Sequence, residues 1–174
     1  MILNIAIENF GPIKERQVLS FEADKSTHLE DAYVAEINGQ RILKMALIYG
    51  ANASGKTTVL KAIEFLRQLV LYPEDKKTDT LDYKPFLFDP NTPQQTSSIG
   101  IEFYQNGIKY LYEVEFIKEA IVSEELYFHD PNKASVFKRK TNLKTQFAEI
   151  EFGSKFNIDS TTKKTLAANT LWNN

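Results

Sequence analysis

The chain has 174 residues, of which 43% are hydrophobic and 25% charged, with a formal net charge of −2 and no cysteine. This composition allows one domain of ordinary size, excludes disulfides and cysteine-ligated metals, and gives no overall positive charge that would attract nucleic acid or anionic membranes. The N-terminus carries Asn4 and Glu8 without a basic leader, and no run approaches the roughly 20 apolar residues of a membrane helix. We therefore expect a cytoplasmic protein with no membrane partner.

The first 43 residues are predicted to form short strands. Apolar residues alternate with polar or small ones from Leu3 to Ile7, which is the period of a strand with one buried face. Asn38-Gly39 is the strongest two-residue signal for a hairpin. The other predicted features of this region are a turn at residues 9–12, a strand at 17–21, a polar loop at 24–31, and hairpin strands at 33–37 and 40–43.

The middle of the chain predicts a strand, a loop and a helix in direct succession. Met45 to Tyr49 is an apolar run closed by a glycine, which favours a strand buried on both faces. Residues 50–55 are small, and Lys56 to Leu71 has the period of an amphipathic helix. Its apolar face is predicted to contain Val59, Ile63, Leu66 and Val70, with Ala62 and Leu69 beside them.

The loop between this strand and this helix fits a phosphate-binding pattern. Gly50 to Thr57 matches G-x-x-x-x-G-K-[ST], the Walker A or P-loop motif, without a mismatch. Its glycines allow close approach of phosphate, its N–H groups converge on an anion, and the helix N-terminus adds partial positive charge. Lys56 is the predicted catalytic cation at the β- and γ-phosphates, and the Thr57 hydroxyl is the predicted Mg²⁺ ligand. The predicted nucleotide-binding residues are Gly50, Ala51, Asn52, Ala53, Ser54, Gly55, Lys56, Thr57 and Thr58.

The second half predicts strands rather than further long helices. A charged linker at residues 73–85, bounded by two prolines, is expected to be exposed. Residues 99–152 alternate in the manner of an antiparallel β-meander, with a turn at Asn106-Gly107. Residues 1–152 are thus assigned to one lobe, and 153–174 to a polar tail that we expect to be mobile or involved in self-association.

Several segments together resemble a known class of ATPase. These are "IENFGPIKE", "LIYGANASGKTTVLKAI", "KPFLFDP" and "IEFYQNGIKYLYEVEF". They resemble the N-terminal lobe of ABC-type ATPase heads, the class of SMC, RecF and OLD proteins, and more specifically the bacterial AAA15/AAA21 ATP-binding proteins. The resemblance implies a mixed α/β P-loop NTPase lobe, in which a mixed sheet carries one P-loop helix and an antiparallel β-subdomain. It also implies ATP and Mg²⁺ as cofactors, dimerisation of two heads, slow hydrolysis, and by analogy a link to phage defence or DNA maintenance.

The sequence departs from the resembling family at two places. Gly11-Pro12 stands where many relatives have arginine and serine near the nucleotide, so a base or ribose contact from those side chains is not expected. A contact from the backbone of this turn and a simple tight turn both stay open. No segment fits a Walker B strand, because "LYFHDP" at residues 126–131 is better interpreted as a strand ending in an Asp-Pro turn. Of the remaining polar groups, the Glu124-Glu125 pair and the basic run 137–140 are interpreted as ordinary surface.

These departures predict an N-terminal fragment or truncated product that binds Mg-nucleotide but hydrolyses it at a rate near background. Two alternatives stay open at this point. One is a nucleotide-responsive interaction module without turnover, and the other is an NTPase or phosphotransferase of another P-loop branch.

Overall fold

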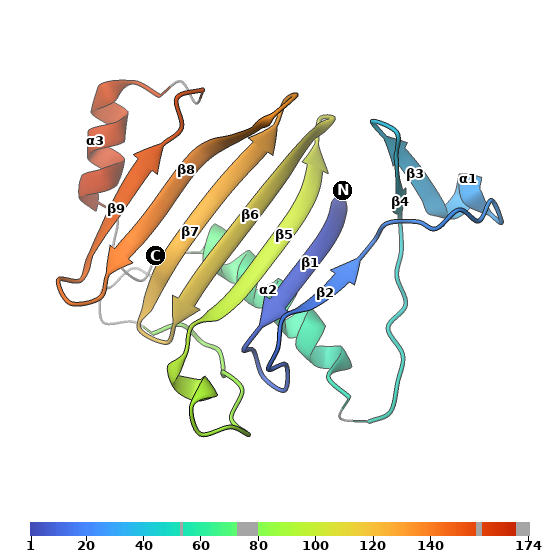
Figure 1. Cartoon of the computed structure of the whole chain (residues 1–174), viewed down its shortest axis with the longest axis horizontal. Coiled ribbons are helices and arrows are strands. Elements are labelled where there is room, and N and C mark those ends of the chain that lie inside the picture. The colour runs from blue at the N-terminus through green and yellow to red at the C-terminus, as the bar shows by residue number, and fades with distance from the viewer. Residues whose placement is uncertain (53, 73–79, 156–157, 170–174) are drawn as a thin grey trace.

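The computed structural model describes residues 1–52, 54–72, 80–155 and 158–169. One seven-stranded sheet dominates it, with the strand order β2-β1-β5-β6-β7-β8-β9, and a separate two-stranded sheet, β3-β4, lies beside it (Figure 1). The elements in chain order are β1 (Ile2–Glu8), β2 (Gln17–Ser20), α1 (Glu30–Tyr33), β3 (Val34–Ile37), β4 (Gln40–Leu43), α2 (Lys56–Leu71), η1 (Thr92–Gln94), β5 (Ser97–Gln105), β6 (Ile108–Ile117), β7 (Ala120–His129), β8 (Lys133–Asn142), β9 (Phe147–Phe152) and α3 (Ser160–Asn169).

The large sheet is antiparallel at every strand pair in the described ranges. Strands β5 to β9 follow one another as hairpins, which confirms the predicted meander. Asn106 and Gly107 both have positive φ, 52° and 77°, as a tight two-residue hairpin requires. Strand β1 is inserted between β2 and β5, with Ile5 opposite Ile101, so the first residues of the chain complete a sheet built mainly from later ones.

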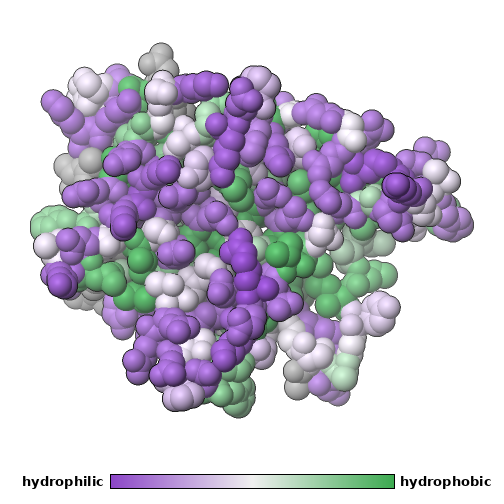
Figure 2. Space-filling model, in the orientation of Figure 1, coloured by the Kyte–Doolittle hydropathy of each residue, from purple (hydrophilic) through white to green (hydrophobic). Residues whose placement is uncertain are grey.

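The core lies on the face of the sheet that α2 covers. Ile5, Ile99 and Phe116 are each at most 1% exposed, and they form one cluster with Ala62 and Leu66 of α2. The opposite face is predominantly hydrophilic (Figure 2). Apolar and polar residues alternate along the strands as the sequence predicts, so most apolar side chains lie under α2 and most polar side chains face solvent.

Helix α2 begins and ends at the predicted residues, but its buried face is rotated slightly from the prediction. Val59, Ile63 and Leu66 pack on the core as expected, with Phe65 and Leu69, whereas Val70 is 56% exposed. Phe65, which the prediction did not place on the apolar face, packs on the core. In the described ranges, no helix has the length and apolar character needed to cross a bilayer.

The predicted buried strand at Met45 to Tyr49 is wrong. Residues 45–50 have no regular secondary structure, and this segment runs alone from β4 to α2 (Figure 1). Leu47 is 79% exposed and Tyr49 is 92% exposed. A strand requires neighbours for its N–H and C=O groups, and the place next to β1 in the sheet is already occupied by β5. The parallel component of the predicted mixed sheet is consequently missing from the described structure, although the mixed α/β class is confirmed.

The linker is less exposed than predicted where the structure describes it, and the tail contains a helix, while its predicted mobility or self-association stays a prediction. Residues 73–79 of the linker lie outside the described residues, but Leu81 is only 3% exposed and Tyr83 packs on the core. In the tail, residues 156–157 and 170–174 lie outside the described residues. Between them, Asp159 accepts hydrogen bonds from the N–H groups of Thr161 and Thr162 and so starts α3.

Candidate nucleotide-binding site

Gly50 and Ser54, near the two ends of the loop that precedes α2, lie close together, and no side chain caps the N-terminus of the helix. A Cβ on Gly50 would lie 3.0 Å from Ser54 Oγ, so the two ends of the loop approach each other. Gly55 precedes the helix at φ 91°, a conformation that favours glycine, and no side chain caps the helix. Thr58 donates its N–H to Gly55 O at 2.9 Å, and the positive end of the α2 dipole lies at this loop.

Lys56 extends across this loop. Its Nζ donates hydrogen bonds to Gly50 O at 2.9 Å and to Ala51 O at 2.7 Å. The ammonium is held at the mouth of the loop by two neutral carbonyl groups. An anion that entered the loop would offer the ammonium a stronger, charge-assisted partner in the same place.

The remaining predicted loop residues divide into two groups. Asn52, Ser54 and Thr57 are exposed, while Thr58 is half-buried. Ala53 lies outside the described residues. The exposed Thr57 hydroxyl, on the first turn of α2, is a hard oxygen donor of the type that Mg²⁺ accepts when phosphate oxygens complete its coordination. The roles of all nine predicted residues toward a ligand stay predictions.

The turn at residues 9–12 lies directly beside the phosphate loop. A Cβ on Gly11 would be 3.2 Å from Thr58 Cγ2, and a Cβ on Gly55 would be 3.8 Å from Pro12 Cγ. The Gly11 N–H donates to Lys84 O at 2.7 Å, so this main-chain group is already used within the protein. Gly11 also has a φ of 55°, which a residue with a side chain adopts only at a cost.

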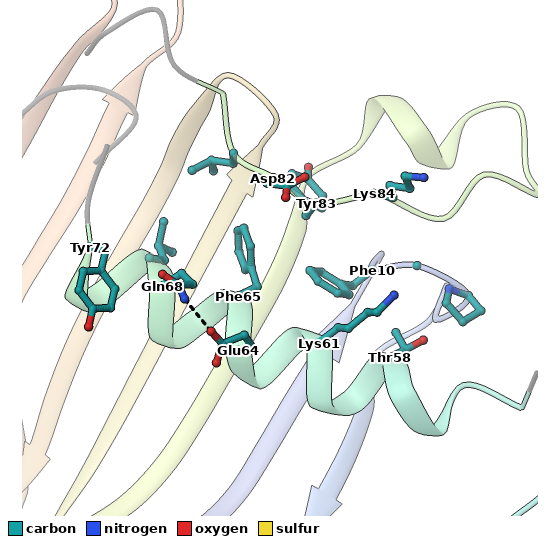
Figure 3. Close-up of a pocket in the computed structure, with 14 residues that line it drawn as sticks. Phe10, Thr58, Lys61, Glu64, Phe65, Gln68, Tyr72, Asp82, Tyr83 and Lys84 are labelled. Atoms are coloured by element: carbon teal, nitrogen blue, oxygen red, sulfur yellow. Dashed lines mark hydrogen bonds between the residues drawn. The ribbon is translucent and has the colours of Figure 1, made fainter. Parts of the chain in front are cut away.

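A groove of about 750 Å³ begins at this turn and follows α2 from Thr58 to Tyr72 (Figure 3). Its floor is aromatic, because the ring of Phe10 stacks on Tyr83 at 5.9 Å and packs on Phe65 at 5.7 Å. Fourteen residues of helix rise span about 21 Å, so the groove is longer than a nucleoside. This groove is not predicted from the sequence, although the aromatic residues at positions 65 and 83 are a signal for it.

The charged side chains give the groove a polarity. Lys61 and Lys84 lie at the end near the phosphate loop (Figure 3). Farther along α2, the Glu64 carboxylate accepts hydrogen bonds from Arg67 and Gln68, and these lower its pKa to about 2. Glu64 therefore stays ionised at neutral pH. Because Arg67 pairs with Glu64 at 2.8 Å, the uneven charge of the groove comes mainly from Lys61 and Lys84, and these would orient an anionic end of a ligand toward the loop.

The carboxylates singled out on β7 do not join this site. Glu124 and Glu125 point to opposite faces of the sheet as expected, but Glu124 is not ordinary surface. It accepts hydrogen bonds from the Tyr112 hydroxyl at 2.8 Å and from Arg139 Nη1 at 3.4 Å, and the Arg139 side chain is 3% exposed. Burial raises the pKa of Tyr112 and lowers the pKa of Arg139. The predicted basic surface run is therefore interrupted by one buried arginine.

The segment that most resembled a Walker B strand is confirmed as a strand with a turn. Strand β7 ends at His129, and the following β7–β8 turn lies at the opposite end of the sheet from the start of α2 (Figure 1). Asp130 thus has no access to the phosphate loop.

A family model described as an AAA domain, putative AbiEii toxin, of type IV toxin–antitoxin systems matches residues 45–164. The chain belongs to this AAA-domain family. The match begins just before the phosphate loop and continues through the meander into α3, and it confirms the AAA21-type resemblance noted in the sequence. Membership assigns the chain to a nucleotide-binding, ATPase-like class. The comparison with curated proteins gave no match.

Proposed function

We propose that this AAA-domain chain binds ATP with Mg²⁺ through residues 50–58, as part of an ABC-type ATPase. One observation carries the proposal: the ammonium of Lys56 spans a curled glycine loop at the uncapped N-terminus of a 16-residue helix. Loop amides, helix dipole and lysine are then three sources of positive potential at one place.

Lys56 and Thr57 each have a task in this arrangement. Lys56 exchanges its bonds to the carbonyls of Gly50 and Ala51 for phosphate oxygens. The Thr57 hydroxyl is the protein ligand for Mg²⁺, which neutralises phosphate charge when bound. The nucleoside extends past Thr58 into the loop end of the groove, where Lys61 and Lys84 face the phosphates and the aromatic floor lies beyond them.

Hydrolysis by this chain alone is proposed to be near background. Phosphoryl transfer requires a positioned water as well as a phosphate clamp. The one Walker B-like carboxylate of the sequence, Asp130, follows β7 at the far end of the sheet. Turnover would then depend on groups from another polypeptide segment, as in the ABC-type class.

Self-association is the proposed partner interaction. The exposed apolar side chains between β4 and α2, above all Leu47 and Tyr49, favour it. Light scattering at increasing protein concentration tests this part, and a monomer over the whole range would contradict it.

Calorimetric titration of Mg-ATP, Mg-ADP and adenosine tests the main proposal. Lys56→Ala should weaken Mg-ATP binding by about tenfold, because charge-assisted hydrogen bonds contribute about 1.5–3 kcal/mol and the free lysine already has two partners. Lys140→Ala on β8 removes the same charge from an exposed position and should leave the affinity within twofold.

Equal binding of ATP and adenosine, or equal loss in both variants, would contradict the proposal. A phosphate-release assay on the same samples measures turnover. Robust release that Lys56→Ala abolishes would refute the expectation of near-background hydrolysis while supporting the nucleotide site.

A further inference from the structure

Asn9 is a buried polar residue whose side chain is fully engaged. It is 2% exposed, and the two hydrogens of its amide Nδ2 are shared among three carbonyl oxygens, those of Thr92 at 2.9 Å, Gln95 at 3.1 Å and Thr96 at 3.2 Å. Its Oδ1 accepts the N–H of Phe86 at 2.9 Å. One side chain thus fixes four main-chain groups of the segment that leads from the groove to β5.

The main chain of Asn9 is engaged as well. Its N–H donates to Lys14 O at 3.1 Å, and its carbonyl accepts the Ser97 hydroxyl at 2.6 Å. Its φ is 49°, in the left-handed region that asparagine tolerates better than most residues. Asparagine meets all of these demands because it combines this conformation with a donor and an acceptor in one side chain.

Asn9 is followed directly by the residues of the turn that lie against the phosphate loop and the start of α2. Phe10 packs on Phe65 of α2, and Gly11 donates its N–H to Lys84 O. Gly11 and Pro12 then meet Thr58 and Gly55 at the distances described for the site. The turn at residues 9–12 is therefore a wedge, with the Asn9 network on one side and the start of α2 on the other.

We infer that Asn9 is a positioning residue of the nucleotide site. It touches no part of the loop itself. Its hydrogen bonds hold the wedge against Gly55 and Thr58, and so fix the place where the loop passes into the helix. Without these hydrogen bonds, the wedge moves independently of the segment of residues 86–96. The phosphate loop then samples conformations in which its N–H groups do not point at a bound phosphate. This inference rests on the proposed binding of nucleotide at the loop.

A buried asparagine that supports only the fold would behave differently. Its replacement would lower the melting temperature without a specific effect on ligand affinity. The two roles are therefore separated by comparing variants that lose similar stability. Ile42→Ala is the matched control, since Ile42 is fully buried in a second cluster with Leu3 and Tyr104, away from the loop.

The experiment measures the Kd for Mg-ATP by calorimetry, at a temperature where every variant is folded by circular dichroism. Asn9→Ala should raise the Kd at least tenfold, while Ile42→Ala should change it less than twofold despite its lower melting temperature. Asn9→Gly keeps the left-handed conformation without the amide, so it should behave like Asn9→Ala. Recovery of affinity in Asn9→Gly would show that backbone conformation, rather than the hydrogen bonds, is what matters, and would overturn the inference.

Two further arms complete the test. If Asn9→Ala does not fold, Ser97→Ala removes the bond to the Asn9 carbonyl together with the contact of the Ser97 hydroxyl with Tyr83, and Tyr83→Phe removes only the second of these. Ser97→Ala should raise the Kd two- to fivefold above that of Tyr83→Phe, and equal Kd values for these two variants would overturn the inference. Lys56→Ala is titrated in parallel. Affinity that depends on Lys56 but not on Asn9 refutes the positioning role and leaves the proposed function intact, whereas binding that is independent of Lys56 refutes both.

Discussion

Phe65 is the aromatic side chain through which α2 packs on the sheet, and the loss of stability on its removal should be measurable. Phe65 contacts three rings, with centroid distances of 5.7 Å to Phe10, 5.6 Å to Tyr83 and 4.8 Å to Phe116. Phenylalanine-to-alanine changes in cores cost about 3–5 kcal/mol, and each aromatic pair adds about 0.5–1.5 kcal/mol beyond buried area. Because Phe65 also borders the groove and is only half-buried, we expect Phe65→Ala to lower the free energy of unfolding by about 3 kcal/mol.

Urea unfolding followed by circular dichroism measures this loss. Phe65→Leu is the control that keeps apolar volume but not the ring, and it should cost about 1 kcal/mol. A double-mutant cycle of Phe65→Leu with Tyr83→Leu should give a coupling energy of about 0.5–1.5 kcal/mol. A loss below about 1 kcal/mol in Phe65→Ala would refute the packing of α2 described here, since the ring would then be no better buried in the folded state than in the unfolded chain.

Two further predictions concern single side chains. Thr57→Ala should weaken the Mg²⁺ dependence of ATP binding more than the binding measured in EDTA, and calorimetry with and without Mg²⁺ checks this; an equal loss under both conditions would contradict a role in metal binding. The hydrogen bond from Lys14, with those from backbone N–H groups, holds the pKa of the Asp89 carboxyl well below its usual range. A lowered folded-state pKa stabilises the protein above the usual carboxyl pKa of about 4, and this stabilisation is lost as the pH falls toward the folded-state value. Asp89→Asn should therefore melt at a lower temperature at pH 7, and the difference should shrink between about pH 4 and pH 2; a difference that is constant with pH would refute this.

The parts of the fold that the sequence predicted are those governed by short-range pattern. Asn38-Gly39 and Asn106-Gly107 impose positive φ at both turn positions, so their hairpins follow from local chemistry. Helix α2 has a strong period and a glycine immediately before it, and its bounds were correct.

The parts that failed depend on distant neighbours. Residues 45–49 have the composition of a buried strand, but a strand is stable only beside another strand, and composition does not show whether one is present. The burial of Leu81 was missed because charged neighbours surround it in sequence, while its N–H pairs with the carbonyl of Lys118. Similarly, the pattern placed Glu124 and Glu125 on opposite faces, yet only the register with β8 brings Arg139 beside Glu124.

In the candidate site, the sequence identified the loop but not its surroundings. The Walker A motif is visible in the sequence because the residues that would bind phosphate are consecutive. The wedge of residues 9–12 and the groove are assembled from segments near positions 10, 60 and 83, and no local pattern connects these.

Because β1 pairs with β5, the large sheet is built from two parts of the chain that lie far apart in sequence. The exposed connection from β4 to α2, with Tyr49 at 92% exposure, joins an N-terminal piece to a C-terminal piece, and the two share one sheet through the pairing of β1 with β5. A single proteolytic cut at Tyr49 would remove the covalent link but leave β1 hydrogen-bonded to β5 along its length. The two fragments should then remain together as a nicked complex, and separately expressed halves should complement each other. The same arrangement delays folding, since β1 must wait for the synthesis and closure of a loop of about 90 residues before its inner edge is paired.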